Sequence, residues 1–582
     1  MLFDKFVQYL ERIENTSSRN EMTKILSQLV QKLSARDSRE AAYLIQGRIA
    51  PVFEPLEFNI AEKMMLRALS VTFNISEQNI QNEFHEIGDM GTLAQKYRER
   101  LQKPYKDIDV ELVYERLHDI AMFSGRGSQD KKILGIRDLL EDLDPLGCRY
   151  VARVLVSKLR LGVSSKTMLD AISWAESGDK SLRKDIERAY YACSDLGLVM
   201  ETYKDSGLPG LDKLQSRPGV PVFSKLVERI PTTEKIIEKM GPVFAQPKFD
   251  GLRCQIHKWE ENGFVNVKLF SRNLEDMTEM FPDVVESVRG LEAKSFILDS
   301  EVIGYNTETE EFVPFQKTMY RKRKYGVTEK VAAIPVNVFV FDIMYLNGVE
   351  IMSESSANRI ELLRKLVGGS ENQIKLTETL KFSDPEKLEK YFMENVSEGL
   401  EGIIVKRIGS IYEPGTRNFE WVKLKRAMKG HLSDTVDVVI MGYYSGRGRL
   451  AKFGIGAILV GVLDKETDRY VTIAKVGTGI TDDLWKEIAT TLIPLVVDER
   501  PNSYVVDKML IPDHWVIPDI VSEIRADEIT RSPVHTCARD KEGVGYALRF
   551  PRMEAFIRDK SPEDCTSVKE VLGLYDAQVT PK

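Results

Sequence analysis

A lysine at position 248 lies in a short segment whose residue types could do covalent chemistry. The segment reads Gln246-Pro247-Lys248-Phe249-Asp250-Gly251-Leu252-Arg253. Side chains alternate along a strand, so Gln246, Lys248 and Asp250 would share one face before the chain turns at Gly251. A lysine amine is nucleophilic only when neutral, a form that nearby cations and a bound metal favour. The segment predicts a nucleophile in a cleft, although Lys-x-Asp-Gly alone is also common in surface turns.

Five further segments follow in a fixed order, and each can present polar or aromatic side chains from one face of a strand. Asp299 and Glu301 share a face because they are two residues apart, and Phe339 with Phe341 forms an aromatic platform. The order predicts that all of them line the cleft of Lys248. The segments are Ser271-Arg272-Asn273, Asp299-Ser300-Glu301, Phe339 to Asp342, Glu401 to Lys406, and Trp421 to Lys425 with Arg417 six residues before Lys423.

The sequence lacks the common motifs of other nucleotide-binding and hydrolytic enzymes. It has no Gly-x-x-x-x-Gly-Lys-[Ser/Thr] loop, and neither Gly446-Arg447-Gly448 nor Gly454-Ile455-Gly456 has the third glycine of a dinucleotide fingerprint. No Gly-x-Ser-x-Gly elbow is present, and the six histidines show no metal-ligand spacing. The five cysteines never form Cys-x-x-Cys, which argues against a zinc site and a disulfide framework.

The first 215 residues are predicted to be a helical domain, because apolar residues recur at intervals of three and four. Its clearest stretch, 149–172, should run as a helix with Leu159 inward, break at Gly162 and restart at a cap formed by Ser164-Ser165. A helix N-terminus can bind phosphate through its free N–H groups. Lys158 and Arg160 beside this junction are therefore candidate DNA contacts.

The pattern changes after a linker that contains Pro218 and Pro221. Short alternating runs then predict a mixed α/β domain over 216–425, and closely spaced strands predict a small barrel over 426–582. The predicted strands are Gln246 to Asp250, Phe296 to Ile303, Val336 to Phe341, Val436 to Tyr444, Ile455 to Leu463 and Tyr470 to Val476, with a helix from Asp483 to Leu495. The fold class is thus multidomain, α and α+β.

The amino-acid composition is compatible with this multidomain fold. The chain has 582 residues, of which 43% are apolar and 29% charged, enough for two to four globular domains. The net charge of -7 does not suggest a polyanionic partner, but basic clusters at Arg321 to Lys324 and at Lys423 to Lys429 leave local patches possible. The N-terminus lacks the order of a signal peptide and no apolar run reaches membrane-span length, so we expect no membrane and a cytoplasmic location.

Taken together, the ordered segments closely resemble those of the ATP-dependent DNA ligases, members of the covalent nucleotidyltransferase superfamily. The archaeal type with a helical N-terminal domain fits best. The resemblance covers nearly the whole chain, and its N-terminal part rests mainly on Lys158-Leu159-Arg160-Leu161-Gly162. It implies an all-helical DNA-binding domain, a mixed α/β nucleotidyltransferase domain and a C-terminal OB-fold β-barrel.

The resemblance also implies a mechanism. Lys248 would attack the α-phosphorus of ATP, form a phosphoramidate to AMP and release pyrophosphate. Phe341 would stack on adenine, and cations would neutralise the triphosphate, from which phosphoryl transfer gains most of its acceleration. The implied nucleotide-binding residues are Gln246, Arg253, Arg272, Glu301, Phe341, Arg417, Lys423 and Lys425, and the implied ligands of Mg²⁺ (or Mn²⁺) are Glu301 and Glu401.

Two parts of the sequence depart from the family pattern. Gln246 lies where the family usually carries a glutamate near adenine, although an amide can still hydrogen-bond the base. Near the C-terminus, Leu548 to Arg552 and Asp559-Lys560 resemble the last motif, which acts on pyrophosphate, but residues 553–558 contain fewer arginines than usual. By this resemblance Arg552 and Lys560 are the candidate pyrophosphate residues.

The implied partner is nicked double-stranded DNA, sealed in replication, repair and recombination by a monomeric, nucleoid-associated protein. Gln102-Lys103-Pro104-Tyr105 lies where related ligases can bind a sliding clamp, but it lacks paired aromatics. An RNA ligase or a capping-type guanylyltransferase shares the lysine motif and stays open, although the helical domain argues against both. A DNA-end binding protein with a decayed site is the non-enzyme alternative, and an NAD-dependent ligase would be expected to carry a four-cysteine zinc module.

Overall fold

The computed structural model describes the chain except for residues 102, 306–311, 314–317, 319–320, 322–333, 369–372, 399, 426–433, 447–449, 451–452 and 580–582. The chain forms two compact units: Met1–Ser216 with Val220–Val222, and Arg217–Gly219 with Phe223–Lys582. Some features of the sequence analysis lie partly or wholly outside the described residues. They are the two basic clusters, the pair Arg447-Gly448, and Gln102, which begins the candidate clamp segment.

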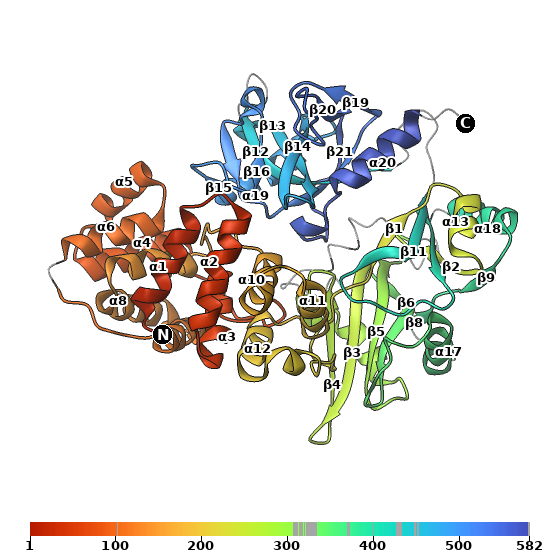
Figure 1. Cartoon of the computed structure of the whole chain (residues 1–582), viewed down its shortest axis with the longest axis horizontal. Coiled ribbons are helices and arrows are strands. Elements are labelled where there is room, and N and C mark those ends of the chain that lie inside the picture. The colour runs from red at the N-terminus through yellow and green to blue at the C-terminus, as the bar shows by residue number, and fades with distance from the viewer. Residues whose placement is uncertain are drawn as a thin grey trace. The chain divides into compact units, whose positions relative to one another are not determined.

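The first unit is helical, as the apolar periodicity predicts, and Figure 1 draws it from red to yellow. Its core is lined by residues spaced at three and four, such as Phe6, Leu10 and Ile13 of the first helix. The helices are α1 Phe3–Glu14, α2 Arg19–Lys32, α3 Ala35–Ile45, α4 Glu62–Phe73, α5 Glu77–Ile87, α6 Met90–Arg100, α7 Val110–Met122, α8 Ser128–Asp142, α9 Pro145–Leu155, α10 Ser165–Ser177, α11 Arg183–Cys193 and α12 Leu196–Leu211.

The junction between α9 and α10 differs in one respect from the sequence prediction. The helix ends at Leu155 rather than near Gly162, because Ser157 adopts a left-handed φ of 55°, a conformation that ends helices. Ser164 caps α10 by accepting a hydrogen bond from the backbone N–H of Thr167, as predicted, and Ser165 is already helical.

The second unit begins with two sheets that form the mixed α/β part. One has the strand order β1-β11-β10-β2-β9 and the other β4-β3-β5-β6-β7, with β8 pairing β6. The strands are β1 Leu226–Arg229, β2 Val243–Lys248, β3 Leu252–Glu261, β4 Phe264–Ser271, β5 Phe296–Gly304, β6 Val336–Leu346, β7 Val349–Glu350, β8 Ile374–Leu376, β9 Leu380–Phe382, β10 Gly402–Arg407 and β11 Arg417–Lys425.

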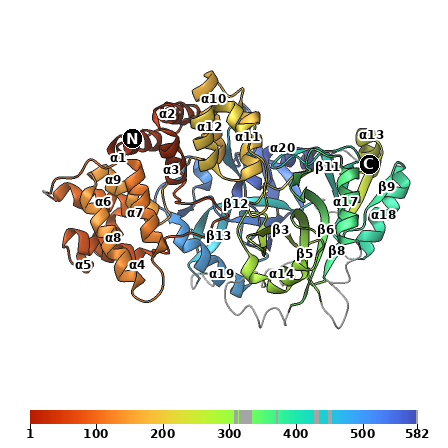
Figure 2. The ribbon, with the colours of Figure 1, turned by 90° about the horizontal axis from the view of Figure 1, so that it is seen from below.

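Helices cover the outer face of each of these sheets. The helices α14 Pro282–Arg289 and α17 Ser356–Val367 pack on the second sheet, and α13 Thr233–Met240 and α18 Pro385–Ser397 pack on the first. Both views show α17 beside β8 and α18 beside β9 (Figures 1 and 2). Because the helices bury the outer faces, the remaining faces are free to carry polar groups toward each other.

The C-terminal part is a curled sheet with the order β15-β17-β12-β13-β14-β16, extended by β18 and β21, and a separate pair β19-β20. Its core contains Val438, Ile458 and Ile473 from the three long strands and Trp485 from a helix. The elements are β12 Val436–Ser445, β13 Ile455–Asp464, β14 Arg469–Val476, α19 Asp482–Leu492, β15 Val496–Val497, β16 Tyr504–Val505, β17 His514–Val516, β18 Val521–Arg525, β19 Glu528–Ser532, β20 Gly545–Arg549, β21 Arg552–Ala555 and α20 Val568–Val579.

All five cysteines are buried free thiols, and no helix in the described parts of the chain is both long and apolar enough to cross a membrane.

Candidate active site

Lys248 ends β2, and its amine forms an ion pair with the carboxylate of Glu401. Strand pairing explains the meeting: Gly402 of β10 is opposite Lys248 on one side and opposite Lys425 of β11 on the other. A side chain at position 402 is excluded, because a Cβ there would lie 2.1 Å from the carbonyl oxygen of Leu424 and φ is 143°. Three neighbouring strands therefore bring one carboxylate between two lysines.

The lysines of β11 surround this pair with positive charge. Lys425 lies 3.5 Å from Glu401 and 3.4 Å from Asp434, and Lys423 lies 3.8 Å from Asp434. Burial alone would raise the pKa of Glu401, but Lys248 and Lys425 hold it well below its ordinary value. Burial, with the like charges of Lys425, Lys560 and Lys248, lowers the pKa of Lys423 to about 8, against the opposing pull of Asp434. The cluster holds two carboxylates, Glu401 and Asp434, among Lys248, Lys423 and Lys425.

Glu301 of β5 lies near Lys248, whereas Asp299, on the same face of β5, binds Arg253. Burial raises the pKa of Glu301 to about 7, although the charges of Lys248 and Arg253 oppose the shift. Asp299 is fully buried and accepts two hydrogen bonds from Arg253, at 3.0 and 2.6 Å, and one from Tyr412 at 2.8 Å. Arg253 is thus held by a structural carboxylate, and Glu301 is the member of the pair that is left for a ligand.

Gln246 and Phe341 meet between the two sheets. The amide nitrogen of Gln246 donates to the backbone carbonyl of Phe341 at 3.2 Å and to the hydroxyl of Thr379 at 2.9 Å. The guanidinium of Arg253 lies 5.5 Å from the centre of the Phe341 ring, and the amine of Lys406 lies 5.2 Å from it. The expected aromatic platform is therefore flanked by cations. Phe339 stacks instead on Phe249, with ring centres 4.2 Å apart.

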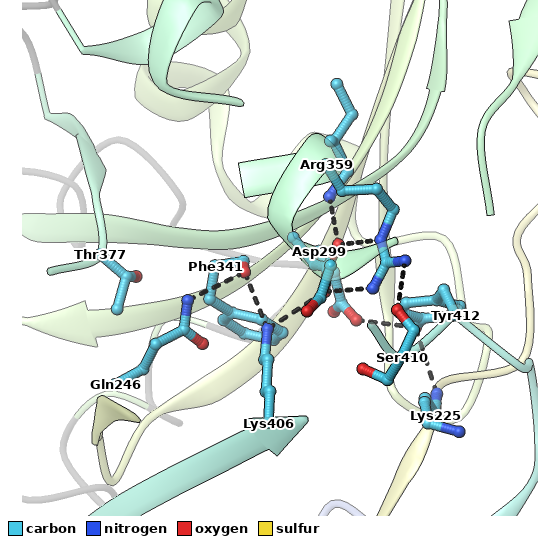
Figure 3. A network of polar contacts seen from close by, with 12 residues as sticks. Lys225, Gln246, Asp299, Phe341, Arg359, Thr377, Lys406, Ser410 and Tyr412 are labelled. Carbon is cyan, nitrogen blue, oxygen red and sulfur yellow. Dashed lines mark hydrogen bonds and ion pairs between the residues drawn. The ribbon is translucent and has the colours of Figure 1, made fainter. Parts of the chain in front are cut away.

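A buried network behind Phe341 joins the sheets to α17. Asp342 accepts hydrogen bonds from Arg359 at 2.8 and 3.3 Å and from Lys406 at 3.1 Å, and Lys406 also donates to the Phe341 carbonyl at 2.9 Å. Figure 3 shows Lys406 reaching toward Phe341, with Gln246 on the other side of the same carbonyl. Opposite charges and strong hydrogen bonds compensate the burial of these groups.

Comparisons with known proteins decide the family. Family models described as "DNA ligase N terminus", "ATP dependent DNA ligase domain" and "ATP dependent DNA ligase C terminal region" match residues 2–173, 224–425 and 451–560. A "Probable DNA ligase" of Dictyoglomus turgidum is 45% identical over 584 residues, covering 100% of this chain and 99% of the relative. The chain belongs to the ATP-dependent DNA ligases.

A second relative agrees. The "DNA ligase" of Saccharolobus solfataricus is 35% identical and covers 100% of this chain and 98% of its own. A solved structure of "mycobacterial DNA ligase D complexed with ATP and MES" is similar at 23% identity and a TM-score of 0.36, covering 59% of this chain and 97% of the other. The predicted family is confirmed, and the curled C-terminal sheet is consistent with the predicted OB-fold.

The C-terminal cations of the ligase lie in two different places. Lys560 pairs with Asp437, and burial together with the like charges of Arg272 and Arg558 lowers its pKa. Arg552 lies apart from them on β21, with a half-exposed side chain 3.4 Å from Asp527. Sequence reasoning placed Arg552 in the site and left out Arg558, which binds Glu523 at 2.8 Å and Asp437 at 3.4 Å and whose charge acts on Glu401.

Two further expected phosphate residues have carboxylate partners in the C-terminal part. Arg417 pairs with Glu570 of α20, and Arg272 lies 3.9 Å from Asp564. Burial lowers the pKa of Arg272, while Asp564 opposes the shift. The described contacts of Arg417 are thus with α20 and not with the Lys248–Glu401 pair.

Several residues of the buried polar networks that support the site were missed by sequence reasoning. Arg359, Tyr412 and Lys225 belong to no predicted segment, and their contacts join positions far apart in the chain. The signal that could have found Arg558 is the triplet Arg558-Asp559-Lys560, in which two cations flank one carboxylate.

In the helical unit, the two candidate DNA contacts lie in the non-helical junction before α10. Arg160 has a φ of 60°, donates to the carbonyl of Gly88 at 3.3 Å and lies 3.8 Å from Asp89. Lys158 lies two residues earlier, on the same junction.

Within the described residues, no group of three or more His, Cys, Asp or Glu side chains is arranged to hold a metal ion. Glu301 and Glu401 are nevertheless hard oxygen donors beside the lysine, and Mg²⁺ is commonly held by one or two carboxylates together with substrate phosphates. The residues present fit that kind of metal.

Proposed function

We propose that this ligase seals 3′-OH/5′-phosphate nicks in duplex DNA through a lysyl-AMP at Lys248 and an adenylylated DNA. The observation that carries the proposal is the ion pair of Lys248 with Glu401, placed beside Glu301, Lys423 and Lys425 where three strands meet. This arrangement offers one nucleophile, two carboxylates and a cationic surface that suits a triphosphate.

In the first step the Nζ atom of Lys248 forms a bond to the α-phosphorus of ATP, and the bond to the β-phosphate oxygen breaks. Pyrophosphate leaves with the electron pair, and the amine loses a proton. Glu401, which the amine already contacts, orients it, and the proton passes to water, because the lowered pKa of Glu401 makes this carboxylate a poor acceptor. A divalent ion held by Glu301 and Glu401 would supply charge that neutralises the phosphates. Lys423 and Lys425 add to that neutralisation from β11.

In the later steps the DNA 5′-phosphate attacks the adenylyl phosphorus and Lys248 is released. The 3′-OH then attacks the 5′-phosphorus, and AMP leaves as the phosphodiester forms. The base would lie against Phe341 and Gln246, and Arg253 and Arg272 would contact ribose and phosphate oxygens. We assign Arg417, Arg558 and Lys560 to binding the phosphates and pyrophosphate. To bind them, each of these cations must exchange its carboxylate partner for the ligand.

Lys158 and Arg160 would contact the phosphate backbone of the nicked duplex near the N-terminus of α10. We further propose that the enzyme acts as a monomer in replication, repair and recombination at the nucleoid, and that a sliding clamp is a candidate partner. The side chain of Tyr105 is 56% exposed, which supports a contact with such a clamp.

The test is the intact mass of the protein after incubation with ATP and magnesium. The native chain should gain one AMP, and Lys248→Ala and the charge-preserving Lys248→Arg should gain none while both keep their circular dichroism spectra. AMP on either variant would refute the assignment. Parallel reactions with GTP and with nicked RNA test the alternatives, since sealing of RNA only, or labelling by GTP only, would replace DNA ligation with one of them.

A further inference from the structure

The carbonyl of Phe341 is a shared acceptor at the base site. A backbone carbonyl has two lone pairs, and here one accepts from Lys406 at 2.9 Å and the other from Gln246 at 3.2 Å. A carbonyl cannot donate, so the nitrogen end of the Gln246 amide must face it. The orientation of this amide therefore follows from chemistry, and not only from atom assignment.

Both amide N–H donors of Gln246 are engaged. The second goes to the hydroxyl of Thr379 at 2.9 Å, and that hydroxyl in turn donates to the carbonyl of Thr377 at 3.2 Å. The amide oxygen is left as the hydrogen-bonding group that Gln246 can offer to a base. In Figure 3 the amide nitrogen faces the carbonyl oxygen of Phe341, and the amide oxygen lies farther from that carbonyl. Adenine presents an amino donor at its six position, whereas guanine presents an acceptor there.

Lys406 is held so that it cannot easily leave this carbonyl. It is fully buried, donates to Asp342 at 3.1 Å, and places its amine 3.9 Å from the centre of the Trp421 ring. Its position on β10 is fixed by pairing with Trp421 of β11 and Phe244 of β2. A buried ammonium with these partners is a rigid support for whatever it contacts.

We propose that Lys406 is a positioning residue that determines purine selection: by holding the Phe341 carbonyl it fixes Gln246 with its oxygen toward the base, so that the site accepts adenine and rejects guanine. This inference rests on the proposed function, because it takes the base to lie against Phe341 and Gln246. Lys406 itself contacts no reacting atom, and the chemistry stays with Lys248.

The test compares Lys406→Met with a matched control, Arg359→Met. Both remove a fully buried cation from Asp342, but the described bonds of Arg359 go to Asp342 and to the carbonyls of Ser410 and Glu354, not to Phe341. Covalent nucleotide loading is measured at varied ATP and GTP. Lys406→Met should raise KM for ATP about tenfold and lower the preference for ATP over GTP by a similar factor, with a smaller change in kcat. Arg359→Met should lower Tm and leave both nucleotide parameters unchanged.

A second variant covers the case in which Lys406→Met does not fold. Thr379→Val removes the other partner of the Gln246 amide at a half-buried and nearly isosteric position, and it should shift KM and nucleotide preference in the same direction. Native parameters in the folded Lys406→Met, or in Thr379→Val if that alone folds, would overturn the inference, and so would an equal shift in Arg359→Met. Failure of the proposed function is seen separately, as absence of AMP on Lys248 in the native chain.

Discussion

The helical unit and the catalytic part each bury a charged network, but the two networks end differently. In the helical unit, Arg153 is 3% exposed and lies between Asp89, with bonds of 2.6 to 3.2 Å, and Glu14 at 2.9 Å. In the catalytic part, Asp342 is 1% exposed and lies between Arg359 and Lys406. The first joins helices to one another, whereas the second continues through Lys406 to the carbonyl of Phe341. Buried ion pairs thus join elements in both regions, and in the catalytic part they also reach the residue against which we propose that the base lies.

The largest expected effect comes from breaking the helical network. Arg153→Met leaves the buried Asp89 and the partly exposed Glu14 without their central partner, which should cost about 3–5 kcal/mol of stability. Thermal unfolding should show the loss in the helical unit. AMP loading should be unchanged at temperatures where the variant is folded, since the site lies in the other unit. Loss of AMP loading in the folded variant would show that the two networks are not independent.

A second large effect is expected at the centre of the catalytic cluster. Glu401→Gln removes the carboxylate that pairs with Lys248 and Lys425 and should slow AMP loading about 100- to 1000-fold, on the order of an electrostatic group at a reacting centre. The measurement is single-turnover loading at saturating ATP. The exposed Glu398→Gln, three residues earlier in the chain, is the control and should load at the native rate. A native rate in Glu401→Gln would remove this carboxylate from the mechanism.

A smaller, pH-dependent effect distinguishes the helical unit. Burial, with Glu111, Asp37 and Glu115 nearby, raises the pKa of Glu40 to about 7 against the opposing charge of Arg36. A raised pKa means that the folded state holds the proton that the unfolded state loses near pH 4.5. The contribution of Glu40 to stability is therefore complete below pH 4.5 and is lost as the pH rises through 7. Unfolding of the isoelectronic Glu40→Gln, compared with the native chain across this window, should lack that decline.

The smallest expected effect concerns DNA. Arg160→Ala removes one candidate phosphate contact, so the slope of log affinity against log salt for nicked duplex should fall by about 1, with affinity weakened alike for different sequences. Because Arg160 also lies 3.8 Å from Asp89, a melting curve must show that the fold persists. An unaltered slope would take Arg160 out of the interface.

Local patterns in the sequence predict the bounds of an element and the face of a side chain where a single strand or helix determines them. The apolar runs predicted β5, β12 and β13 to within one residue at each end, and each of these strands is buried on both faces. Strand alternation predicted that Gln246 and Lys248 share a face, and they lie on β2 opposite Ile404 and Gly402.

Sequence reasoning failed where contacts cross between distant segments. Nothing near Arg359 indicates that Asp342 is its partner, and Asp434 reaches Lys423 and Lys425 from the next part of the chain. The resemblance to the family's last motif groups Arg552 with Lys560; Arg552 lies on β21 beside Asp527 and Lys560 pairs with Asp437, and their shared role stays a prediction. The helix α9 ends earlier than predicted because Ser157 adopts a left-handed backbone conformation, which the apolar pattern does not indicate.

The burial of every cysteine has a practical consequence for work on this enzyme. Cys148, Cys193, Cys254, Cys537 and Cys565 are all buried. Burial raises the pKa of the Cys148, Cys254, Cys537 and Cys565 thiols, to about 12 for Cys537, so none of these four presents a reactive thiolate near neutral pH. A single cysteine introduced on each unit would then take a fluorescent dye with little background. Energy transfer between two such dyes would report how the units move during a catalytic cycle, without any need to remove native residues.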